Sequence, residues 1–321
     1  MANKTLLSIC IPTYNRSRHL KTTIESIIQQ PEFLNGRVEI VICDNASTDD
    51  TSIVVGEFSN RYSNISYYRN ECNIRDKNYP MVLSKGNGIL RKLHNDTLKL
   101  EPSSLSFMCD TVEKYDKNRP LIFFGNGNIE VTSNNLLSFK QFVVQASYWI
   151  TWIGAFTIWE DDCKDLEFDT DGCDLLLWQV KKSYELGFKK DECVILNKPF
   201  AQVQSVYKKD ISYGIYKVFY TNYLGLLKPY VEKNIIVKRD YELIRKDLLY
   251  NFFTSLIVQW ELNQEKMNYS KEEDLKTLVF SEYENEVYWH EYRSFYRKKM
   301  ALSKAKNFIK NTWKRIKKHG K

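Results

Sequence analysis

The sequence predicts an α/β protein with a largely parallel sheet, followed by a helical region. Between residues 6 and 70, three apolar runs of strand length alternate with helical patterns: LLSICIP (6–12), RVEIVICDN (37–45) and NISYYRN (64–70). This alternation is typical of parallel strands joined by right-handed crossovers. After about residue 206, glycine becomes scarce and long helical patterns replace the strands.

Each segment between the strands carries its own helical signal. Residues 17–30 place leucine and isoleucine at helical spacing. The helix that follows the second strand opens with Ser47 and Thr48, which are candidate caps. YPMVLSKG (79–86) predicts a short helix that ends at Gly86. Residues 102–115 predict a longer helix, with Pro102 near its first turn.

Composition indicates an ordinary soluble protein. Of 321 residues, 43% are hydrophobic and 27% are charged, which is enough to form a core. Seven scattered cysteines without a CxxC pair favour buried thiols in a reducing compartment. The start, MANKTLLSICIP, is too short in apolar residues for a signal peptide, and the longest apolar segment (148–159) is about half of a membrane span. We therefore expect a cytoplasmic protein.

Polar loops follow the first two strands, PTYNR (12–16) and CDNAST (43–48). Ligands of open α/β sheets bind at the carboxyl ends of the strands, beside a switch in strand order. Helix capping by Thr13, Asn15 and Ser17 is the alternative for the first loop. The chain has neither GxGxxG after the first strand nor GxxxxGK[ST], which argues against dinucleotide and P-loop chemistry.

A fourth strand is expected in GILRKLHNDTL (88–98), where the triplet Asn95-Asp96-Thr97 breaks the apolar pattern. A carboxylate between an amide and a hydroxyl could bind a hard cation whose other ligands are phosphate and water. An ordinary polar turn is the alternative.

The motifs LSICIPTYNRSRHLKTTIESI, VEIVICDNASTDDT and YYRNECNI, in this order and spacing, resemble the family 2 inverting glycosyltransferases of the GT-A fold. They are most similar to bacterial enzymes of O-antigen and capsule assembly. The resemblance is strong over residues 5–110 and weaker to about 205. Beyond that, only the tail is generally similar to abequosyltransferase-like members. The resemblance implies a GT-A fold, which is a Rossmann-like mixed sheet flanked by helices, with a helical C-terminal region.

The resemblance also implies a binding site for a nucleotide-sugar donor, most often a UDP-sugar. The loop after the first strand would surround the nucleotide, and Asp44 would bind the base. The loop with Arg75, Lys77 and Asn78, which matches the family less closely, would approach the ribose and diphosphate. The residues implied for nucleotide binding are Thr13, Tyr14, Asn15, Arg16, Asp44, Asn45, Ser47, Arg75, Lys77, Asn78 and Asn95.

The family's Asp-x-Asp metal motif should close the fourth strand, where this chain has Asn95-Asp96-Thr97. The resemblance implies that Asp96 and Thr97 bind Mn²⁺ or Mg²⁺. Because the outer acid of the Asp-x-Asp motif is missing, this binding should be weakened. A metal-independent transferase is the alternative, in which basic side chains neutralise the leaving diphosphate.

The family supplies a catalytic base from an acid-containing turn before a helix. Inversion is a single displacement in which the acceptor hydroxyl loses its proton. DLEFDTDGCDLLLWQV (165–180) has this layout, with strand-like LEF, a turn, and a helix from about Leu175. Asp174 is the first candidate, Asp171 the second, and Asp161 or Asp162 the third. Capping of the helix by Asp174 is the alternative role.

Two further features are left open by the sequence. Trp149, Trp152 and Trp159 lie around Gly154 in the sequence, and they could form part of the core or stack on an acceptor sugar.

The final segment carries twelve Lys/Arg and no acid from Arg293 to Lys321, and subtracting these from the net charge of +7 leaves −5 for the rest. An apolar stripe runs along this basic helix: Leu302, Ala305, Ile309, Trp313 and Ile316.

The tail pattern is typical of a helix lying on an anionic membrane surface. Docking on the protein itself is the alternative, and nucleic-acid binding is disfavoured because no such motif is present. We expect three parts: 1–205, a GT-A nucleotide-sugar glycosyltransferase domain; 206–292, a helical region; and 293–321, the basic helix.

The function expected is that of an inverting glycosyltransferase of surface polysaccharide synthesis, acting on a lipid-linked oligosaccharide or glycan acceptor at the inner face of the plasma membrane. A sugar-nucleotidyltransferase and a catalytically inactive homologue that binds membrane or partners are the rivals.

Overall fold

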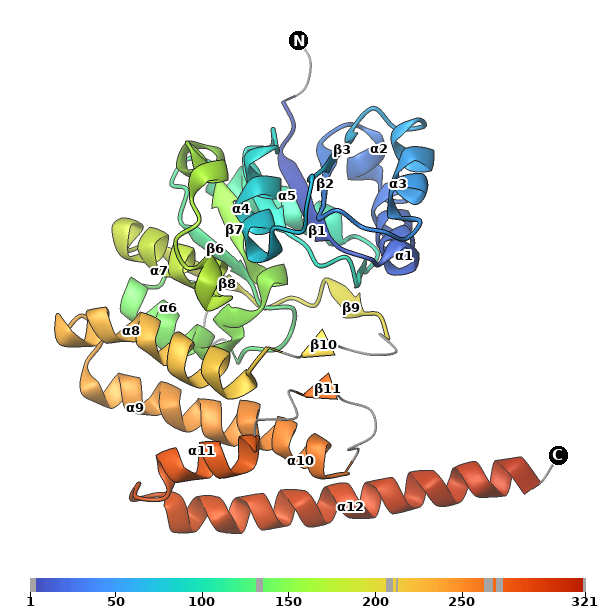
Figure 1. Cartoon of the computed structure of the whole chain (residues 1–321). Helices are drawn as coiled ribbons and strands as arrows, with labels where there is room; N and C mark the ends of the chain where they lie inside the picture. The colour runs from blue at the N-terminus through green and yellow to red at the C-terminus, as the bar shows by residue number, and fades with distance from the viewer. Residues whose placement is uncertain are drawn as a thin grey trace. The chain divides into compact units, whose positions relative to one another are not determined.

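A computed structural model describes residues 4–130, 135–205, 210–211, 213–262, 268–269 and 274–319. The chain divides into two compact units, Met1–Val206 and Tyr207–Lys321. Figure 1 shows the strands of the larger sheet in the first unit and a set of helices in the second. The mixed sheet with flanking helices confirms the predicted fold class.

The central sheet of the first unit has five strands in the order β3-β2-β1-β4-β7. These are β1 (Leu7–Thr13), β2 (Val38–Asp44), β3 (Ile65–Arg69), β4 (Leu90–Leu93) and β7 (Thr157–Trp159). The first four are parallel, and β7 runs antiparallel to β4. Parallel strands buried on both faces read as continuous apolar runs, as β1 and β2 do.

Helices cover the faces of this sheet. They are α1 (Ser17–Ile28), α2 (Pro31–Leu34), α3 (Thr51–Ser59), α4 (Asn78–Ser84) and α5 (Ser104–Tyr115). The apolar positions of α1 that are spaced three and four residues apart are fully buried, because they form the face that packs on the sheet. These buried positions are Leu20, Ile24 and Ile27.

The second half of this unit adds two short strand pairs and two helices. β5 (Leu98–Leu100) pairs antiparallel with β9 (Ala201–Val203), and β6 (Leu121–Phe124) pairs in parallel with β8 (Cys193–Leu196). The helices are α6 (Phe139–Ala146) and α7 (Trp178–Lys190). Ser138 and Gln141 form a capping box at the start of α6.

The structure confirms the four predicted strands and the break at residues 95–97, but it corrects three local predictions. Ser47 and Thr48 do not cap α3, which follows Asp50 at its N-cap. LEF (166–168) is a 3₁₀ turn, since only Leu166 is buried and Phe168 is 75% exposed. α7 begins at Trp178 rather than near Leu175.

The second unit is helical, as the sequence predicts. It contains α8 (Tyr223–Glu232), α9 (Lys238–Asp247), α10 (Thr254–Leu262), α11 (Leu275–Tyr283) and α12 (Trp289–His319). π-helical turns at 217–222 and 248–253 precede α8 and α10, and a two-residue bridge joins β10 (Asp210–Ile211) to β11 (Asn268–Tyr269).

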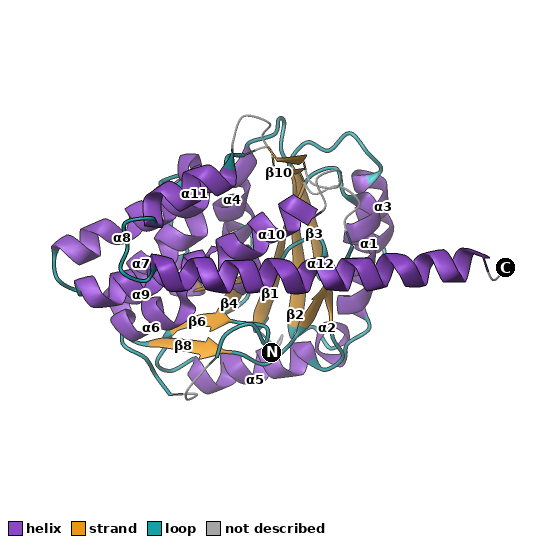
Figure 2. Cartoon of the chain, turned by 90° about the horizontal axis from the view of Figure 1, so that it is seen from below, coloured by secondary structure: helices purple, strands orange, loops and turns teal. Residues whose placement is uncertain are grey.

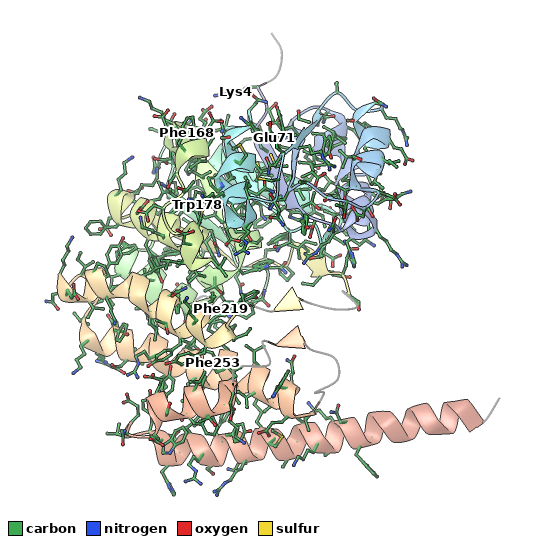
Figure 3. All side chains as sticks on the ribbon, viewed as in Figure 1. Lys4, Glu71, Phe168, Trp178, Phe219 and Phe253 are labelled. Carbon is green, nitrogen blue, oxygen red and sulfur yellow. The ribbon has the colours of Figure 1, made fainter. Side chains whose placement is uncertain are left out.

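Aromatic side chains form the core of the second unit. Phe253, labelled in Figure 3, is fully buried, as are Tyr283 and Tyr292. Phe280 packs edge-on against Tyr292 with ring centroids 5.9 Å apart. Figure 2 shows α12 as one long continuous helix. Within the described ranges, no helix is both long and apolar enough to cross a bilayer.

Candidate functional site

The site lies where the strand order of the central sheet reverses. β1 has β2 on one side and β4 on the other, so the chain segments that leave these strands meet at one sheet edge. Thr13 pairs in register with Asp44 at the ends of β1 and β2. The triplet at 95–97 follows β4 directly. Polar residues from three distant segments are therefore brought together.

Asp96 is held in a corner by residues of the first loop. Its carboxylate accepts a bond from Thr13 Oγ1 at 3.0 Å and pairs with Arg16 Nη1 at 3.0 Å. Its backbone carbonyl accepts from Thr23 Oγ1 at 2.8 Å. Burial raises the pKa of Asp96, and the charge of Arg16 opposes that rise.

Asp44 is completely buried and fully hydrogen-bonded within the chain. Its Oδ1 accepts from the backbone of Ser47 at 2.8 Å, and its Oδ2 accepts from Tyr67 at 2.7 Å and from Arg69 at 3.2 Å. Burial and the bond to Asp44 raise the pKa of Tyr67 to about 12. In this geometry the carboxylate orders the loop, and base reading by Asp44 stays a prediction.

The first two loops are bonded to each other. The backbone of Asn15, in the left-handed region with φ 51°, donates to Ser47 Oγ at 2.9 Å. Asn15 Oδ1 accepts from the backbone of Thr48 at 2.7 Å. Ser47 and Thr48 therefore hold the two loops together instead of capping α3. Tyr14 stays 43% exposed beside them.

Asn45 and Asn78 connect this edge to the next loop. Asn45 donates to Asn73 Oδ1 at 2.7 Å and accepts from the backbone of Ile74 at 2.8 Å. Asn78 is buried, and it donates to the carbonyl of Cys43 at 2.9 Å. Both side chains shape the loop at 73–78.

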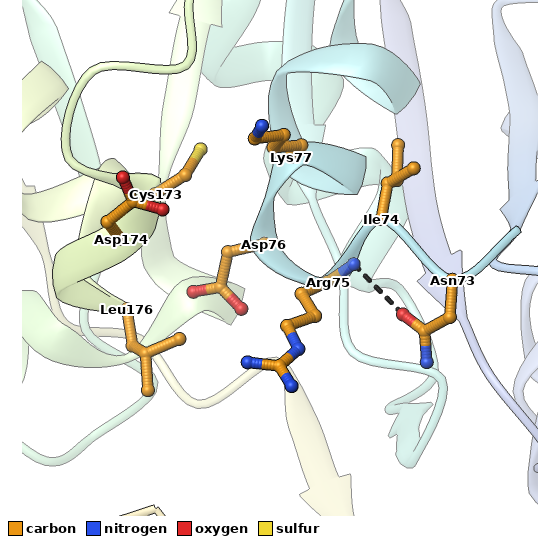
Figure 4. A pocket seen from close by; sticks show the side chains of 8 residues that line it. All are labelled: Asn73, Ile74, Arg75, Asp76, Lys77, Cys173, Asp174 and Leu176. Carbon is orange, nitrogen blue, oxygen red and sulfur yellow. Dashed lines mark hydrogen bonds between the residues drawn. The ribbon is translucent and has the colours of Figure 1, made fainter.

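That loop forms one wall of a hollow of about 350 Å³. The opposite wall is the 3₁₀ turn Cys173–Leu175 and its flanks, just before α7. Figure 4 shows Asp76 and Asp174 extending from the two walls. The hollow is lined by Asn73, Ile74, Arg75, Asp76, Lys77, Cys173, Asp174 and Leu176.

Four charged side chains line this hollow without a hydrogen bond or ion pair to any part of the chain that the structure describes: Arg75, Asp76, Lys77 and Asp174. Burial raises the pKa of Asp76 to about 6, and Arg75 partly opposes the rise. Arg75 also has a positive φ of 53°, a conformation that non-glycine residues seldom adopt. Unpaired charge and backbone strain are both common at ligand sites.

The structure separates Asp174 from the other predicted bases. Asp171 pairs with Lys181 at 2.6 Å, Asp162 pairs with Lys190 at 2.9 Å, and Asp161 pairs with Arg119. None of these three lines the hollow. The capping role is wrong for Asp174, because the N-cap of α7 is Leu177 and receives no side-chain bond.

Two charged residues of this region were missed by sequence reasoning. Asp76 lies between predicted nucleotide contacts, and only the fold places it opposite Asp174. Lys92 is buried in β4, where it donates to the carbonyls of Leu93 at 3.0 Å and Gly154. Burial lowers the pKa of Lys92 to about 7. A lysine inside an apolar strand was the available signal.

The residues at the triplet do not form a set of metal ligands. Both oxygens of Asp96 are engaged by Thr13 and Arg16, and its neighbours Asn95 and Thr97 carry no charge. Asn95 Oδ1 is buried without a hydrogen-bond partner in the described structure. Mg²⁺ is usually bound by one or two carboxylates together with water and substrate phosphates. Across the described residues, no group of three or more His, Cys, Asp or Glu could hold a metal. The chain's own charged donor at this corner is one carboxylate that is already paired with Arg16, which fits Mn²⁺ or Mg²⁺ poorly.

The three tryptophans of residues 149–159 differ in role. Trp159 is buried in β7 and donates to the carbonyl of Pro120 at 2.6 Å, so it belongs to the core. Trp152 is partly buried and stacks on Phe200, with ring centroids 5.9 Å apart. Trp149 is partly buried beside Tyr148.

Comparison with known proteins confirms the resemblance expected from the sequence. Residues 8–78 match the model of the family Glycosyl transferase family 2. The chain is 44% identical over 85 residues to the abequosyltransferase RfbV of Salmonella typhimurium, covering 26% of this chain and 25% of that protein. It is 35% identical over 68 residues to an uncharacterized glycosyltransferase, MG025, of Mycoplasma genitalium, covering 21% and 22%. The chain thus matches about a quarter of the length of these curated relatives.

Solved structures share the fold over much more of the chain. TarS (1–349) of S. aureus in complex with UDP-GlcNAc gives a TM-score of 0.55 at 16% identity, covering 80% of this chain and 76% of that one. The mannosyltransferase PcManGT of Pyrobaculum calidifontis, in complex with GDP-Man and Mn²⁺, gives 0.52 at 10% identity, covering 98% and 88%. This likeness confirms the GT-A fold.

Proposed function

We propose that this chain is an inverting glycosyltransferase that transfers a sugar from a nucleotide donor to a glycan or lipid-linked acceptor. The observation that carries the proposal is the hollow in which Asp174 faces the loop of Arg75 and Lys77, beside the switch point of a GT-A sheet. Asp174 on one wall, and Arg75 and Lys77 beside Asp76 on the other, suit a reaction in which a hydroxyl is deprotonated and a diphosphate departs.

In the proposed reaction, Asp174 is the general base. The acceptor hydroxyl gives its proton to the Asp174 carboxylate while its oxygen forms a bond to the anomeric carbon. The bond from that carbon to the diphosphate oxygen breaks, and its electron pair leaves with the nucleoside diphosphate. Asp174 suits this role because its side chain is exposed in the hollow and has no ion-pair partner in the described structure.

The nucleotide would bind along the loops that follow β1 and β2. The proposed contacts are Thr13 to Arg16, Asp44, Asn45 and Ser47, with Arg75 and Lys77 near the diphosphate. Asn78 and Asn95 would contribute indirectly, by holding the loops in position. A uridine nucleotide is the first choice, supported by the relation of this fold to TarS, which was solved with UDP-GlcNAc. The predicted divalent cation would find one carboxylate at the triplet, Asp96, which is already paired with Arg16.

The pathway proposed is surface polysaccharide synthesis, of O-antigen or capsule. The similarity of 85 residues of the chain to the abequosyltransferase RfbV supports it.

Replacement of Asp174 by Asn tests the function most directly. We expect sugar transfer to fall by about 10²–10⁴-fold, because the acceptor loses its base. Calorimetric affinity for UDP should change little, since the variant keeps the shape of the hollow. Asp171→Asn is the matched control: it removes a carboxylate three residues away that pairs with Lys181, and it should keep most of the activity.

The alternatives have distinct outcomes. Equal loss of UDP affinity and transfer in Asp174→Asn would contradict the base assignment. Failure of the unmodified protein to bind UDP, GDP, CDP or dTDP would contradict the donor class and leave an inactive homologue.

We further propose that α12 holds the enzyme on an anionic membrane, where a lipid-linked acceptor is presented. Leu302 and Ile309 are 64% and 56% exposed on this helix. Lysines accompany them at 304 and 306, and no acid follows Arg293. Exposed apolar side chains among cations are typical of interfacial helices. Trp313 and Ile316 fall where the structure does not describe side chains.

Cosedimentation with vesicles tests this anchor. The full chain should bind vesicles containing phosphatidylglycerol and bind phosphatidylcholine vesicles much less. Deletion of 300–321 should release it. Lys304→Gln with Lys306→Gln should weaken binding by about 2 kcal/mol, at about 1 kcal/mol per charge. Binding by the truncated protein equal to that of the full chain would contradict the anchor.

A further inference from the structure

Arg16 occupies a position between a buried carboxylate and solvent. Its Nη1 pairs with Asp96 Oδ1 at 3.0 Å, and its side chain is 40% exposed while that of Asp96 is 5% exposed. A guanidinium has five N–H donors in a fixed planar fork. In the described structure, only the bond to Asp96 uses them. Most of the fork is thus free for a ligand.

The partner of Arg16 fixes the direction of this fork. Asp96 cannot move away, because Thr13 Oγ1 donates to its Oδ2 at 3.0 Å and Thr23 Oγ1 donates to its backbone carbonyl at 2.8 Å. An arginine held by a buried, immobile carboxylate loses little further entropy when it binds an anion. Preorganised donors of this kind favour bidentate phosphate binding.

The charge at the corner is already balanced without an added cation. Asp96 contributes one negative charge and Arg16 one positive charge, and the flanking Asn95 and Thr97 are neutral. A divalent ion bound to Asp96 would sit beside the positive charge of Arg16 and would find no second carboxylate within the triplet. The corner therefore suits an anion better than it suits a divalent cation.

We propose that Arg16, oriented by Asp96, binds the diphosphate of the nucleotide donor directly and replaces the divalent cation at this edge of the sheet. The inference rests on the proposed function, because it names how the same donor is held. Asp96 is then a positioning residue, and Arg16 carries the electrostatic stabilisation of the leaving group. Arg75 and Lys77 line the nearby hollow, where Asp76 and Asp174 balance their charge, so Arg16 is the cation whose exposed donors carry the proposal.

Calorimetric titration with UDP, in EDTA and in Mn²⁺, tests the proposal. The unmodified protein should bind UDP with the same affinity, within about twofold, under both conditions. Binding that appears only with Mn²⁺ would overturn the inference and leave the proposed function intact. Absence of binding under both conditions would overturn both.

Variants at the corner separate phosphate binding from structural support. Arg16→Lys keeps the ion pair with Asp96 but loses the planar fork, and it should weaken UDP binding by at least about tenfold. Arg16→Gln combined with Asp96→Asn leaves no unpaired buried charge and should weaken it further, with a native circular dichroism spectrum. Arg18→Gln removes an exposed charge two residues away and should leave affinity unchanged. Equal affinity in all of these variants would overturn the role of Arg16.

Discussion

The corner at the sheet edge and the hollow beside it differ in how their charges are balanced. In the corner, Asp44 and Asp96 are buried, and each accepts bonds from an arginine and from other donors of the chain. In the hollow, the charges of both signs have no bonded partner in the described structure. Their residues are Arg75, Asp76, Lys77 and Asp174.

The difference separates scaffold from chemistry. A buried carboxylate that accepts hydrogen bonds only from the chain holds the surrounding loops in place. Its removal therefore lowers the free energy of unfolding. An unpaired charge in an open hollow contributes little to the free energy of unfolding, and it remains available for a ligand. Removal of a carboxylate should therefore cost much stability in the corner and little in the hollow.

Asp44→Ala gives the largest expected effect on stability. The change leaves the backbone of Ser47, the hydroxyl of Tyr67 and the guanidinium of Arg69 without their common acceptor. We expect the free energy of unfolding to fall by about 3 kcal/mol. Urea denaturation followed by circular dichroism would measure it.

Asp174→Ala is the matched comparison for that experiment. Because its carboxylate lacks a bonded partner in the described structure, the free energy of unfolding should change by less than about 0.5 kcal/mol. Similar losses in both variants would show that the hollow is structural, and the contrast with the corner would disappear.

Sequence reasoning located the sheet edge because its signals are local and periodic. The mostly apolar seven-residue segments at β1 and β2 indicate buried strands, and polar residues at and after their ends indicate the loops. The resemblance to a known family extended this to the order of the motifs. Both kinds of signal are contained within short stretches of chain.

The pairing of charges could not be predicted, because it depends on contacts between distant segments. Arg16 and Asp96 are 80 residues apart, and nothing in either motif shows that they meet. Likewise, Asp76 faces Asp174 only because the loop before α4 packs beside the turn before α7. The error at residues 166–168 has a different origin, since three residues of strand-like composition are too few to define a strand without a pairing partner.

A smaller effect is expected for the pH dependence of stability at Asp76. Burial raises its pKa from 3.8 to about 6. The folded chain therefore holds the proton more tightly than the unfolded chain, so the free energy of unfolding should fall as the pH rises from about 4 to about 6. Because the hollow is open to solvent, we expect the loss to be about 1 kcal/mol.

Asp76→Asn isolates this contribution, because the amide has no proton to lose. The variant should match the unmodified protein near pH 4 and exceed its stability at pH 7 by about 1 kcal/mol. Urea midpoints at the two pH values would measure the difference, with Asp174→Asn as the control from the opposite wall. An equal gain at both pH values would mean that Asp76 is strained for steric reasons. The unpaired carboxylate, which distinguishes the hollow from the paired corner, would then have no energetic cost from desolvation.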